Sequence, residues 1–491
     1  MTPEKALPLT GSSPAARSWN GTTKHMLAAK HPQPWQSPSR STAVNGLKRE
    51  LGLFSLTNIV VANMIGAGVL TLAGFLLVEL RNPLLMMVLW FVGGLGALCG
   101  AICYGQLGAA FPLAGGEYAY LSRLFHPLAG FLSGWISFFV GFSAPIAAAA
   151  LAFVEYLARA FPAILTLGIF RDPSAGFIMK KLYAISIIVL FTLLHRHGVR
   201  FGALVQNSLT LIKIAGIILF VAAGFAFGKG DFGNLLQGSR LEANFIQCKS
   251  IGLSFLWIMF AYSGWNASAY IGSEIRTPKK NLPRSLILGT AMVMCLYLAL
   301  NLLYIYAIPI KEVSGTASIG GLAAAKLFGR PLERIISVFI AFALFSSLSA
   351  YIMLGPRVYF SMARDGCFFH FAAKIHPRYK TPSQSILFQG AIAGVMVLAG
   401  SFDQLLTYLG FALAIFPILA VLGVFKLRRR GMARKLIGFP LTPIFFILTS
   451  SLMLVFSFLE RPHESLVAIA TLLLGIPLYF LVFRRKENAN Q

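Results

Sequence analysis

The chain has 491 residues, of which 57 % are apolar and only 12 % are charged, and its formal net charge is +26. A typical soluble domain carries about 25 % charged residues, whereas a helix that spans a bilayer needs about 20 consecutive apolar residues. This composition excludes a soluble enzyme, a nucleic-acid-binding domain and a disordered scaffold as descriptions of most of the chain, and it predicts an all-α polytopic membrane protein.

Residues 1–46 are predicted to form a disordered, basic cytoplasmic tail. The segment is rich in Pro, Ser and Thr and contains no apolar run, so it cannot bury enough apolar surface to fold. It also lacks the hydrophobic core of a cleavable signal peptide. A transit peptide is the alternative, which the Arg and Ser content would permit.

About twelve apolar segments follow the tail, and each is long enough to cross a bilayer as a helix. The fourth is the weakest, because its uninterrupted apolar run lies between Lys181 and His195. It reaches spanning length only if Lys180 and Lys181 extend to the interface. The twelve segments are about 51–78, 83–111, 127–158, 174–194, 201–228, 250–273, 285–309, 333–360, 384–402, 404–425, 436–459 and 464–483.

Lys and Arg are about twice as frequent in the tail and in the loops on its side of the membrane as in the opposite loops. Cytoplasmic loops carry such an excess, so we predict that both termini are cytoplasmic and that the protein lies in the plasma or inner membrane. The predicted transmembrane domain covers about 47–485, and residues 486–491 form a cytoplasmic C-terminus.

The first and sixth spans share an anomaly, a glycine-containing interruption at mid-depth over 63–69 and 260–266. Glycine costs a helix about 1 kcal/mol, and lipid tolerates an interrupted helix only where protein or a cavity satisfies its backbone. Paired interruptions in corresponding halves indicate a transporter binding site. Their separation fits inverted repeats of about 51–228 and 250–425, with extra helices over 436–483. The alternative is that the glycines only allow close helix packing.

The interruptions would expose backbone groups that suit an amino acid. Half-helix N-termini attract anions, so the amides near Ala67 and Gly68 could hold a carboxylate. The carbonyl groups near Met64, Phe260 and Ala261 could accept hydrogen bonds from an ammonium group.

Four stretches carry a likeness to a known family: ANMIGAGVLT (62–71), YGQLGAAFPLAGGEYAYLSRLFHPLAGFLSGW (104–135), FAYSGWNASAYIGSEIRTPKKNLPRSL (260–286) and GPRVYFSMARDGCFF (355–369). With them the chain resembles the amino acid–polyamine–organocation superfamily of permeases, close to its bacterial amino acid permeases and the light chains of heteromeric transporters. The resemblance extends over about 47–483. It implies a five-plus-five inverted repeat with two extra helices, and amino acid transport by alternating access.

The resemblance also assigns roles to residues. The family's carboxylate-binding Gly-Ser-Gly corresponds to Gly66, Ala67 and Gly68, so the serine hydroxyl is missing here. Its ammonium-binding carbonyls are those of the sixth-span interruption, and the aromatic lid would be Trp265 or Phe260. The predicted substrate site comprises Met64, Ile65, Gly66, Ala67, Gly68, Phe260, Ala261, Ser263, Gly264 and Trp265.

Lys213 lies at the middle of the fifth span, about 12 residues or about 18 Å from either end. A lysine at this depth costs about 2.5–3.5 kcal/mol, so it should face the bundle interior, beside the first interruption, Ser346 and Ser347. The resemblance implies a sodium-independent carrier in which the ammonium group stands where sodium sits in related proteins. Transport would then proceed by exchange or be coupled to protons. The alternative is a lysine that reaches an interface.

Six acidic residues that could neutralise a cationic substrate lie at span ends or in loops. Since an unpaired buried charge is costly, their placement favours neutral amino acids. A cationic amino acid or polyamine permease and a transport-dead sensor of the same fold stay open as alternatives. An enzyme is not expected, because no catalytic constellation lies at mid-depth. The six are Glu79, Glu117, Glu155, Glu274, Asp365 and Asp403.

Residues 115–118 resemble the short intracellular loop that helps to close the family's inner gate, and the basic stretch 277–283 lies on the same side. The five cysteines show neither a disulfide framework nor metal-ligand spacing, so no metal or cofactor is expected. Light chains of the family pair with a heavy chain through a cysteine after the third span. Residues 159–181 contain none, so no disulfide-linked heavy chain is expected.

Overall fold

A computed structural model describes most of the chain, while the predicted tails 1–46 and 486–491 lie outside the described residues. Within the described part, α-helices are joined by short loops and by 3₁₀ and π segments, and the only strand-like pairings are two isolated β-bridges. The structure describes residues 47–161, 173–238, 245–313, 319–329, 331–399, 402–432, 437–460 and 462–483.

Each predicted span corresponds to one helix or to consecutive helical segments, so the predicted all-α class is confirmed. The helices of the first repeat are α1 (Leu53–Met64), α2 (Ala67–Leu80), α3 (Pro83–Ala110), α4 (Glu117–Leu124), α5 (Pro127–Ile136), α6 (Ala144–Ala160), α7 (Pro173–Arg196) and α8 (Val199–Phe227). A π segment, η1 (Ser137–Ser143), joins α5 to α6.

Eight helical stretches among the described residues are long and apolar enough to cross a membrane, five of them in the first repeat and three in the rest of the chain. The second repeat and the extra helices are also formed by consecutive helices. These helices are α9 (Phe245–Ala261), α10 (Pro278–Ala307), α11 (Ile319–Phe328), α12 (Pro331–Arg364), α13 (Ser383–Ala399), α14 (Phe402–Arg429), α15 (Leu441–Glu460) and α16 (Pro462–Leu478).

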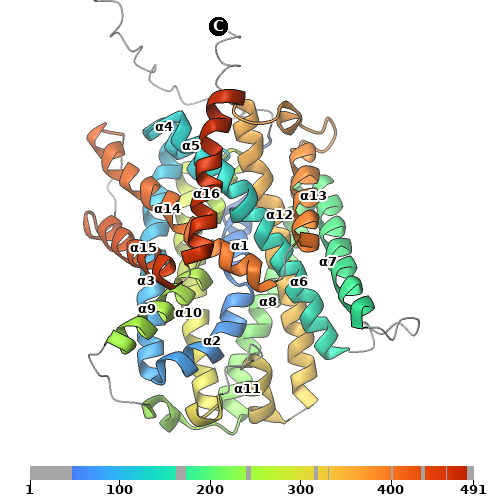
Figure 1. Ribbon diagram of the computed structural model, residues 1–491, viewed down its shortest axis with the longest axis vertical. Helices are drawn as coiled ribbons and strands as arrows, with labels where there is room; N and C mark the ends of the chain where they lie inside the picture. Colours follow the sequence, from blue (N-terminus) through green and yellow to red (C-terminus); the bar gives the residue numbers. More distant parts are fainter. Residues whose placement is uncertain are drawn as a thin grey trace, which may run out of the picture. The chain divides into compact units, whose positions relative to one another are not determined.

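Corresponding spans of the two repeats pack against each other: α3 against α10, α6 against α12, and α7 against α13. Figure 1 shows α7 beside α13 at one edge of the membrane domain, with α14 and α15 toward the opposite edge. The first half of the first span, α1, contacts the second half of the sixth, η4 (Ala267–Tyr270), while α2 contacts α9. The two interrupted spans therefore run antiparallel, as the predicted inverted repeat requires.

The fourth span forms the full-length helix α7, and its two lysines bond to neighbouring spans. Lys180 Nζ lies 2.9 Å from a carboxylate oxygen of Glu155 on α6. Lys181 Nζ donates to the Leu398 carbonyl of α13 at 2.6 Å. The lysines are thus stabilised by protein partners at the end of the span, in addition to any contact with the interface.

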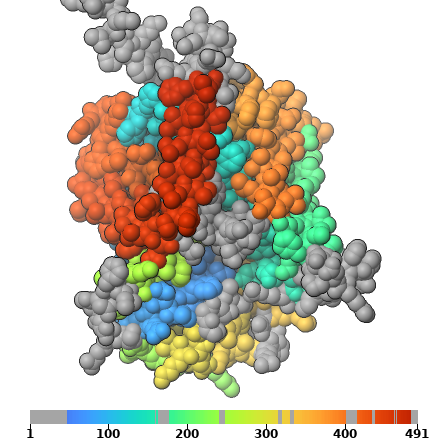
Figure 2. Space-filling view, in the orientation of Figure 1, coloured from blue at the N-terminus to red at the C-terminus, as the bar shows by residue number. Residues whose placement is uncertain are grey.

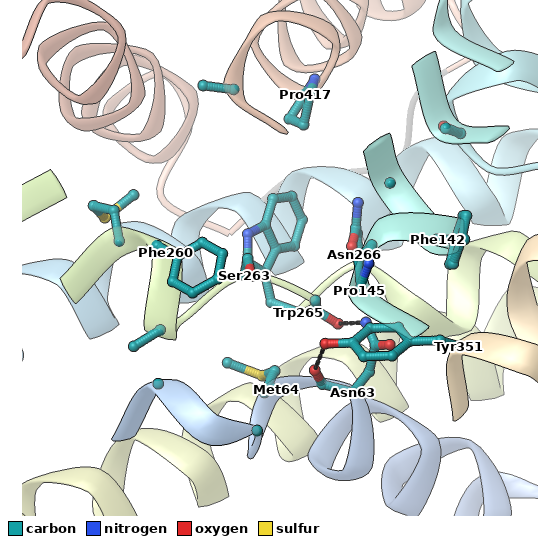
Figure 3. Close-up of a pocket in the computed structure, with 18 of the residues that line it drawn as sticks. Asn63, Met64, Phe142, Pro145, Phe260, Ser263, Trp265, Asn266, Tyr351 and Pro417 are labelled. Atoms are coloured by element: carbon teal, nitrogen blue, oxygen red, sulfur yellow. Dashed lines mark hydrogen bonds between the residues drawn. The ribbon is translucent and has the colours of Figure 1, made fainter. Parts of the chain in front are cut away.

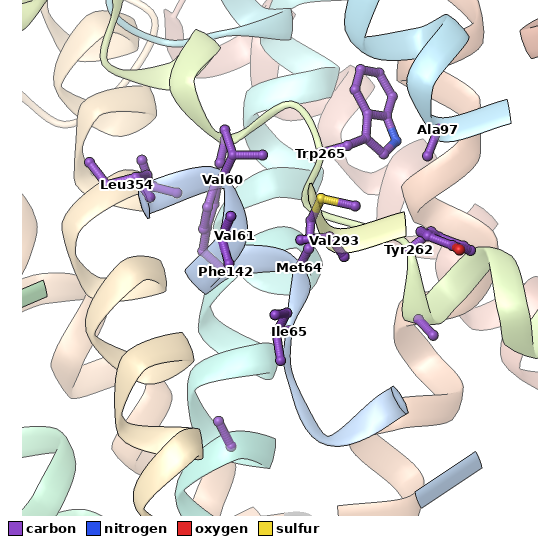
Figure 4. Close-up of a cluster of buried hydrophobic side chains, with 14 of the residues drawn as sticks. Val60, Val61, Met64, Ile65, Ala97, Phe142, Tyr262, Trp265, Val293 and Leu354 are labelled. Atoms are coloured by element: carbon purple, nitrogen blue, oxygen red, sulfur yellow. The ribbon is translucent and has the colours of Figure 1, made fainter. Parts of the chain in front are cut away.

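Helix α1 lies in the hydrophobic core, where Val60, Val61, Met64 and Ile65 are buried against residues of α3, α10 and α12 (Figure 4). It ends at Met64, and Gly66 is extended, with φ −112° and ψ −156°. Because α2 begins at the next residue, the first span consists of two half-helices separated by a short extended stretch.

The sixth span breaks after α9 at a turn in which Gly264 has φ +92°. Its second half is not an α-helix, since it consists of the 3₁₀ turns η4 and η5 (Gly272–Glu274). This half is therefore held by fewer internal backbone hydrogen bonds than an α-helix would supply, and its position depends on side chains from its neighbours.

The extra helices complete the outer surface. α15 packs against α3, α9 and α14, and α16 packs against α5 and α14. Figure 2 shows α16, in red, at the surface of the membrane domain. Large apolar side chains on these two helices, among them Leu448, Leu459 and Leu474, are more than half exposed. Such surfaces suit lipid tails, in agreement with a multi-pass membrane protein.

Candidate functional site

A cavity of about 160 Å³ lies between the two interrupted spans. The first interruption contributes Met64 and Gly66, the sixth contributes Phe260 and Trp265, and α4, α5, η1, α6, α12, α14 and α15 supply the remaining walls. Figure 3 shows Met64 facing Phe260 and Trp265 across this space. An engineered protein cavity of about 150 Å³ holds a benzene molecule, so this volume suits a ligand the size of a small amino acid.

Most of the predicted substrate residues line the cavity, and the exceptions are informative. The side chain of Ile65 is buried away from it. The side chain of Ala67 is not among those that the structure describes. The predicted residues in the wall are Met64, Gly66, Gly68, Phe260, Ala261, Ser263, Gly264 and Trp265.

The N-terminus of α2 meets the cavity at Gly66 and Gly68. Gly66 is the N-cap residue and, as a glycine, has no side chain to accept a hydrogen bond from the first N–H groups of this helix. Such N–H groups, together with the helix dipole, attract a carboxylate or another anion. The arrangement is the one that the sequence predicted for the substrate carboxylate.

The carbonyl groups predicted to bind an ammonium group already have partners. The Tyr297 hydroxyl, on α10, lies 2.7 Å from the Met64 carbonyl oxygen and 3.1 Å from that of Ala261. The Phe260 carbonyl accepts from the Ser263 N–H at 2.9 Å. The Met64 carbonyl also accepts from the Gly66 N–H at 2.9 Å. A hydroxyl donates one proton and a carbonyl oxygen has two lone pairs, so the Phe260 and Ala261 oxygens keep capacity for a further donor, and the Met64 oxygen keeps it when the Tyr297 proton is donated to Ala261. Sequence reasoning missed Tyr297, whose adjacent residues Leu296 and Leu298 are apolar and give no sign of a binding site.

Asn63 links the two interruptions directly. Its side-chain Nδ2 donates to the Gly264 carbonyl at 3.2 Å, and its backbone carbonyl accepts from the Tyr351 hydroxyl at 3.4 Å (Figure 3). A Cβ added at Gly264 would lie 2.4 Å from Asn63 Nδ2. Both the left-handed backbone and this close approach therefore require glycine at position 264.

Trp265 is 6 % exposed and has a packing role in addition to its place in the cavity wall. Its ring meets Tyr104 of α3 edge-on at 4.7 Å and Phe446 of α15 at 5.3 Å. A Cβ added at Gly100 would lie 2.8 Å from the indole. The indole thus fills a slot between α3 and α15, while Phe260 lines the cavity from the end of α9. Which of the two acts as a lid stays a prediction.

Lys213 is fully buried on α8, beside the first interruption. Its Nζ lies 2.5 Å from the Ile65 carbonyl oxygen, 3.0 Å from Ser347 Oγ and 3.4 Å from the Ala62 carbonyl oxygen. An ammonium group has three N–H donors, and each finds an oxygen here. Ser347 also donates to the Ile65 carbonyl at 2.8 Å, so Ile65 contributes to this site through its backbone.

The structure separates the two serines that were predicted together. Ser346 Oγ lies 3.1 Å from Thr210 Oγ1 and 3.4 Å from the amide of Gln206, both on α8. Its partners Thr210 and Gln206 lie about one and about two turns from Lys213 along α8. Ser346 joins α12 to α8. Of the two serines, only Ser347 has a described hydrogen bond to Lys213.

Glu117, which the sequence placed in a loop, is 3 % exposed and lines the cavity. Its Oε1 accepts from the Asn266 amide at 2.6 Å and from the Tyr104 hydroxyl at 2.9 Å. Its Oε2 accepts from the Tyr270 hydroxyl at 2.6 Å. Burial raises the pKa of the Glu117 carboxyl, and the hydrogen bonds from Tyr270, Tyr104 and Asn266 offset part of this shift.

The glycines before Glu117 are the signal that marks its position. Gly115 and Gly116 have φ +106° and +54°, and this turn folds the start of α4 back toward the cavity. The Gly115 N–H donates to the Tyr270 carbonyl at 2.9 Å, and Ala114 forms a β-bridge with Ile271. The loop predicted to be a gate is thus in contact with the second half of the sixth span.

A buried ion pair joins α12 to the turn η5, at the end of the bundle where the loop 115–118 lies. The Arg357 guanidinium of α12 contacts both carboxylate oxygens of Glu274, at 2.8 and 3.1 Å, and both side chains are at most 2 % exposed. The Glu274 carbonyl accepts from the N–H groups of Glu50 and Leu51 at 3.0 Å. The chain just before α1, the turn η5 and helix α12 are therefore joined here.

A family model described as amino acid permease matches residues 51–481. The chain is 30 % identical over 477 residues to the large neutral amino acids transporter small subunit 2 of Mus musculus, covering 95 % of this chain and 87 % of that protein. It is 30 % identical over 449 residues to the Asc-type amino acid transporter 1 of Mus musculus, with coverages of 90 % and 82 %. It is 28 % identical over 454 residues to the serine/threonine exchanger SteT of Bacillus subtilis (strain 168), with coverages of 91 % and 100 %.

Proposed function

Because the chain belongs to the amino acid permease family, we propose that it moves neutral amino acids across a cell membrane by alternating access. The observation that carries the proposal is the cavity between the two interrupted spans, where the N-terminus of α2 faces the backbone carbonyls of α9. Two relatives are named as a large neutral amino acids transporter subunit and a serine/threonine exchanger, and these names support neutral amino acids as the substrate class.

The backbone would hold both charged groups of the substrate. Its carboxylate binds at the N–H groups of α2 around Gly66 and Gly68, where no side chain competes. Its ammonium group binds the carbonyls of Met64, Phe260 and Ala261 through lone pairs that Tyr297 and the backbone leave open. The α-carboxylate and α-ammonium groups are common to every amino acid substrate. Selection among substrate side chains therefore depends on the cavity walls.

The walls favour an uncharged side chain. Ile136, Phe142, Leu344 and Met453 present apolar groups to the cavity. Glu117 is the one acidic side chain among the described residues that line it, and three neutral donors already bind its oxygens. A cationic substrate would have to displace those donors, whereas a neutral side chain would not.

The Lys213 ammonium group would take the place of a sodium ion. Its partners are two backbone carbonyls and a hydroxyl at the first interruption, the oxygen types that coordinate cations in transporters with broken helices. We therefore infer sodium-independent transport, by exchange or coupled to protons. The gate loop 115–118 and the basic stretch 277–283 would face the cytoplasm, as would both termini.

The deciding experiment is uptake by the purified full-length chain in proteoliposomes, with competition by unlabelled compounds. Alanine, serine or leucine should compete at least about tenfold better than arginine or putrescine, which corresponds to about 1.4 kcal/mol of preferential binding. Uptake in which arginine or putrescine competes best would make the chain a cationic permease. Amino acid binding without any uptake or exchange would make it a sensor.

A further inference from the structure

Glu117 is a buried carboxylate without a cationic partner in the described part of the chain. The groups that bind or face it are Tyr104 on α3, Tyr120 on its own helix, and Asn266 and Tyr270 from the sixth span, all of them neutral. A buried charge without a counter-charge is costly. The protonated carboxyl avoids that cost, so this site can hold either state.

The charged groups on neighbouring elements are engaged elsewhere. Arg123, on the same helix, donates to the Ala119 carbonyl at 3.2 Å. Arg357, at the same end of the bundle, is bound to Glu274. Asp365, at the end of α12, accepts from the Tyr118 hydroxyl at 2.7 Å. None of these contacts supplies a positive charge to the Glu117 carboxylate.

The two carboxylate oxygens are not equivalent. Oε1 accepts from the Asn266 amide, which can only donate, and from the Tyr104 hydroxyl, so two donors already occupy it. Oε2 accepts one described hydrogen bond, from the Tyr270 hydroxyl, which can donate or accept and whose oxygen lies 3.1 Å from Asn266 Nδ2. A proton taken up from water in the cavity therefore binds Oε2 and is donated to the Tyr270 oxygen. The Tyr270 hydroxyl proton then turns away from Glu117 toward the cavity that Tyr270 lines.

The ionised carboxylate also holds the second half of the sixth span. Its bonds from Tyr270 and Asn266 connect η4 to α3 and α4, and the Gly115 N–H holds the Tyr270 carbonyl at the same place. Hydrogen bonds to an ionised group are roughly twice as strong as neutral ones. Protonation would therefore weaken the attachment of Asn266 and Tyr270, while the Gly115 N–H and the Arg357–Glu274 ion pair continue to hold the rest of the segment.

We propose that Glu117 is a proton-binding site in the substrate cavity, and that a proton on its Oε2 weakens the bonds by which Asn266 and Tyr270 attach the second half of the sixth span to α3 and α4, so that amino acid movement is linked to proton movement. This inference rests on the transport function proposed above. It assigns the proton to Glu117 and leaves Lys213 charged, in agreement with the three oxygen acceptors of its ammonium group.

The test compares the wild type, Glu117→Gln and Glu79→Gln in proteoliposomes whose membrane potential is clamped. The labelled substrate is the neutral amino acid that competes best for the wild type. With the wild type, an exterior more acidic than the lumen should raise the accumulation of labelled substrate severalfold over that at equal pH. A pH-sensitive dye inside the vesicles should report that the lumen becomes more acidic. The ratio of the two accumulations should fall to one in Glu117→Gln. It should persist in Glu79→Gln, whose carboxylate lies outside the cavity wall.

A second measurement does not depend on transport. The infrared C=O band of a protonated carboxyl should appear in the purified wild type as the pH is lowered and be absent in Glu117→Gln. In Tyr270→Phe its midpoint should move to higher pH, because the ionised form loses a hydrogen bond. Wild-type transport that does not change with the pH gradient would overturn the inference, as would a carboxyl C=O band in Glu117→Gln identical to that of the wild type. Either result would leave the transport proposal standing. Absence of any amino acid transport by the wild type would instead overturn the proposed function.

Discussion

Gly66 and Gly68 lie two residues apart in the first interruption, yet their surroundings differ. A Cβ at Gly68 would lie 3.1 Å from the Ala261 Cβ, so this glycine allows α2 to approach α9 closely. A Cβ at Gly66 would meet only Ser347 Oγ, at 3.9 Å. Gly66 also has a backbone conformation open to other residues. Gly66 is therefore the position at which ligand binding can be separated from packing.

We expect Gly66→Val to weaken amino acid binding at least about tenfold, because its methyl groups would occupy cavity space beside the α2 N-terminus. The protein should remain monodisperse in size-exclusion chromatography. Gly394→Val on α13 is the matched control, since a Cβ there meets nothing within 4 Å. Unchanged affinity of Gly66→Val in equilibrium binding would remove the first interruption from the site.

Lys213→Ala should reduce transport more than about tenfold, because it removes the ammonium donor from the Ala62 carbonyl, from Ser347 and from the Ile65 carbonyl, which keeps only its bond from Ser347. Each unsatisfied buried group costs about 1–3 kcal/mol, and about 1.4 kcal/mol corresponds to a factor of ten. Wild-type uptake should be the same when choline replaces sodium.

The control for Lys213 is Lys229→Ala, which removes an exposed lysine just after α8. Its uptake should match that of the wild type. Strict dependence of wild-type uptake on sodium, or full activity of Lys213→Ala, would each contradict the proposed role of the ammonium group.

At the scale of elements, the two interrupted spans are held as a pair. Asn63 reaches from the first interruption to Gly264 in the sixth, and Tyr297 contacts one carbonyl of each. Ala261 closes the contact at the other end, against Gly68. Alternating access requires half-helices that move relative to their surroundings, so these contacts determine which parts move together.

Tyr297→Phe should lower the thermal unfolding temperature and slow transport, because it removes the only described side-chain donor to the Met64 and Ala261 carbonyls. The expected loss of stability is about 1–3 kcal/mol. Tyr306→Phe is the control on the same helix, where the lost bond joins a hydroxyl to the Gly228 carbonyl at 3.2 Å. Equal effects of both substitutions on transport would mean that the Tyr297 bridge has no special role.

At the scale of the whole molecule, two native cysteines can report the orientation in the membrane. Cys248, near the start of α9, is exposed, and Cys367, in the loop after α12, is partly exposed. These positions belong to loops on opposite sides of the predicted topology. The distribution of Lys and Arg places Cys367 on the cytoplasmic side and Cys248 outside.

An impermeant thiol reagent applied to intact cells should therefore label Cys248 and leave Cys367 unmodified. Cys248→Ser should abolish the labelling, whereas Cys367→Ser should leave it unchanged. In permeabilised cells both cysteines should react. Labelling of Cys367 but not Cys248 in intact cells would reverse the predicted orientation of the termini.

The sequence by itself determined the membrane class, the twelve spans and the two interruptions. Apolar run length and glycine placement are local properties, and lipid leaves a broken helix few alternatives. Lys213 could also be assigned to the interior, since its depth within one span is a local measurement. The predicted fold is confirmed by the structure and by the family match, whereas the roles of the site residues stay predictions.

Only the tertiary structure decided which groups meet. Tyr297 contacts Met64 across 233 positions of sequence, and Glu117 meets Asn266 across 149. No local pattern encodes such pairings, because they arise when distant spans pack together. The same reason explains why Ser347 contacts Lys213 while Ser346, its neighbour in sequence, points to Gln206 and Thr210. On a helix, adjacent residues face different directions, and only the position of the neighbouring helix decides which of them reaches the site.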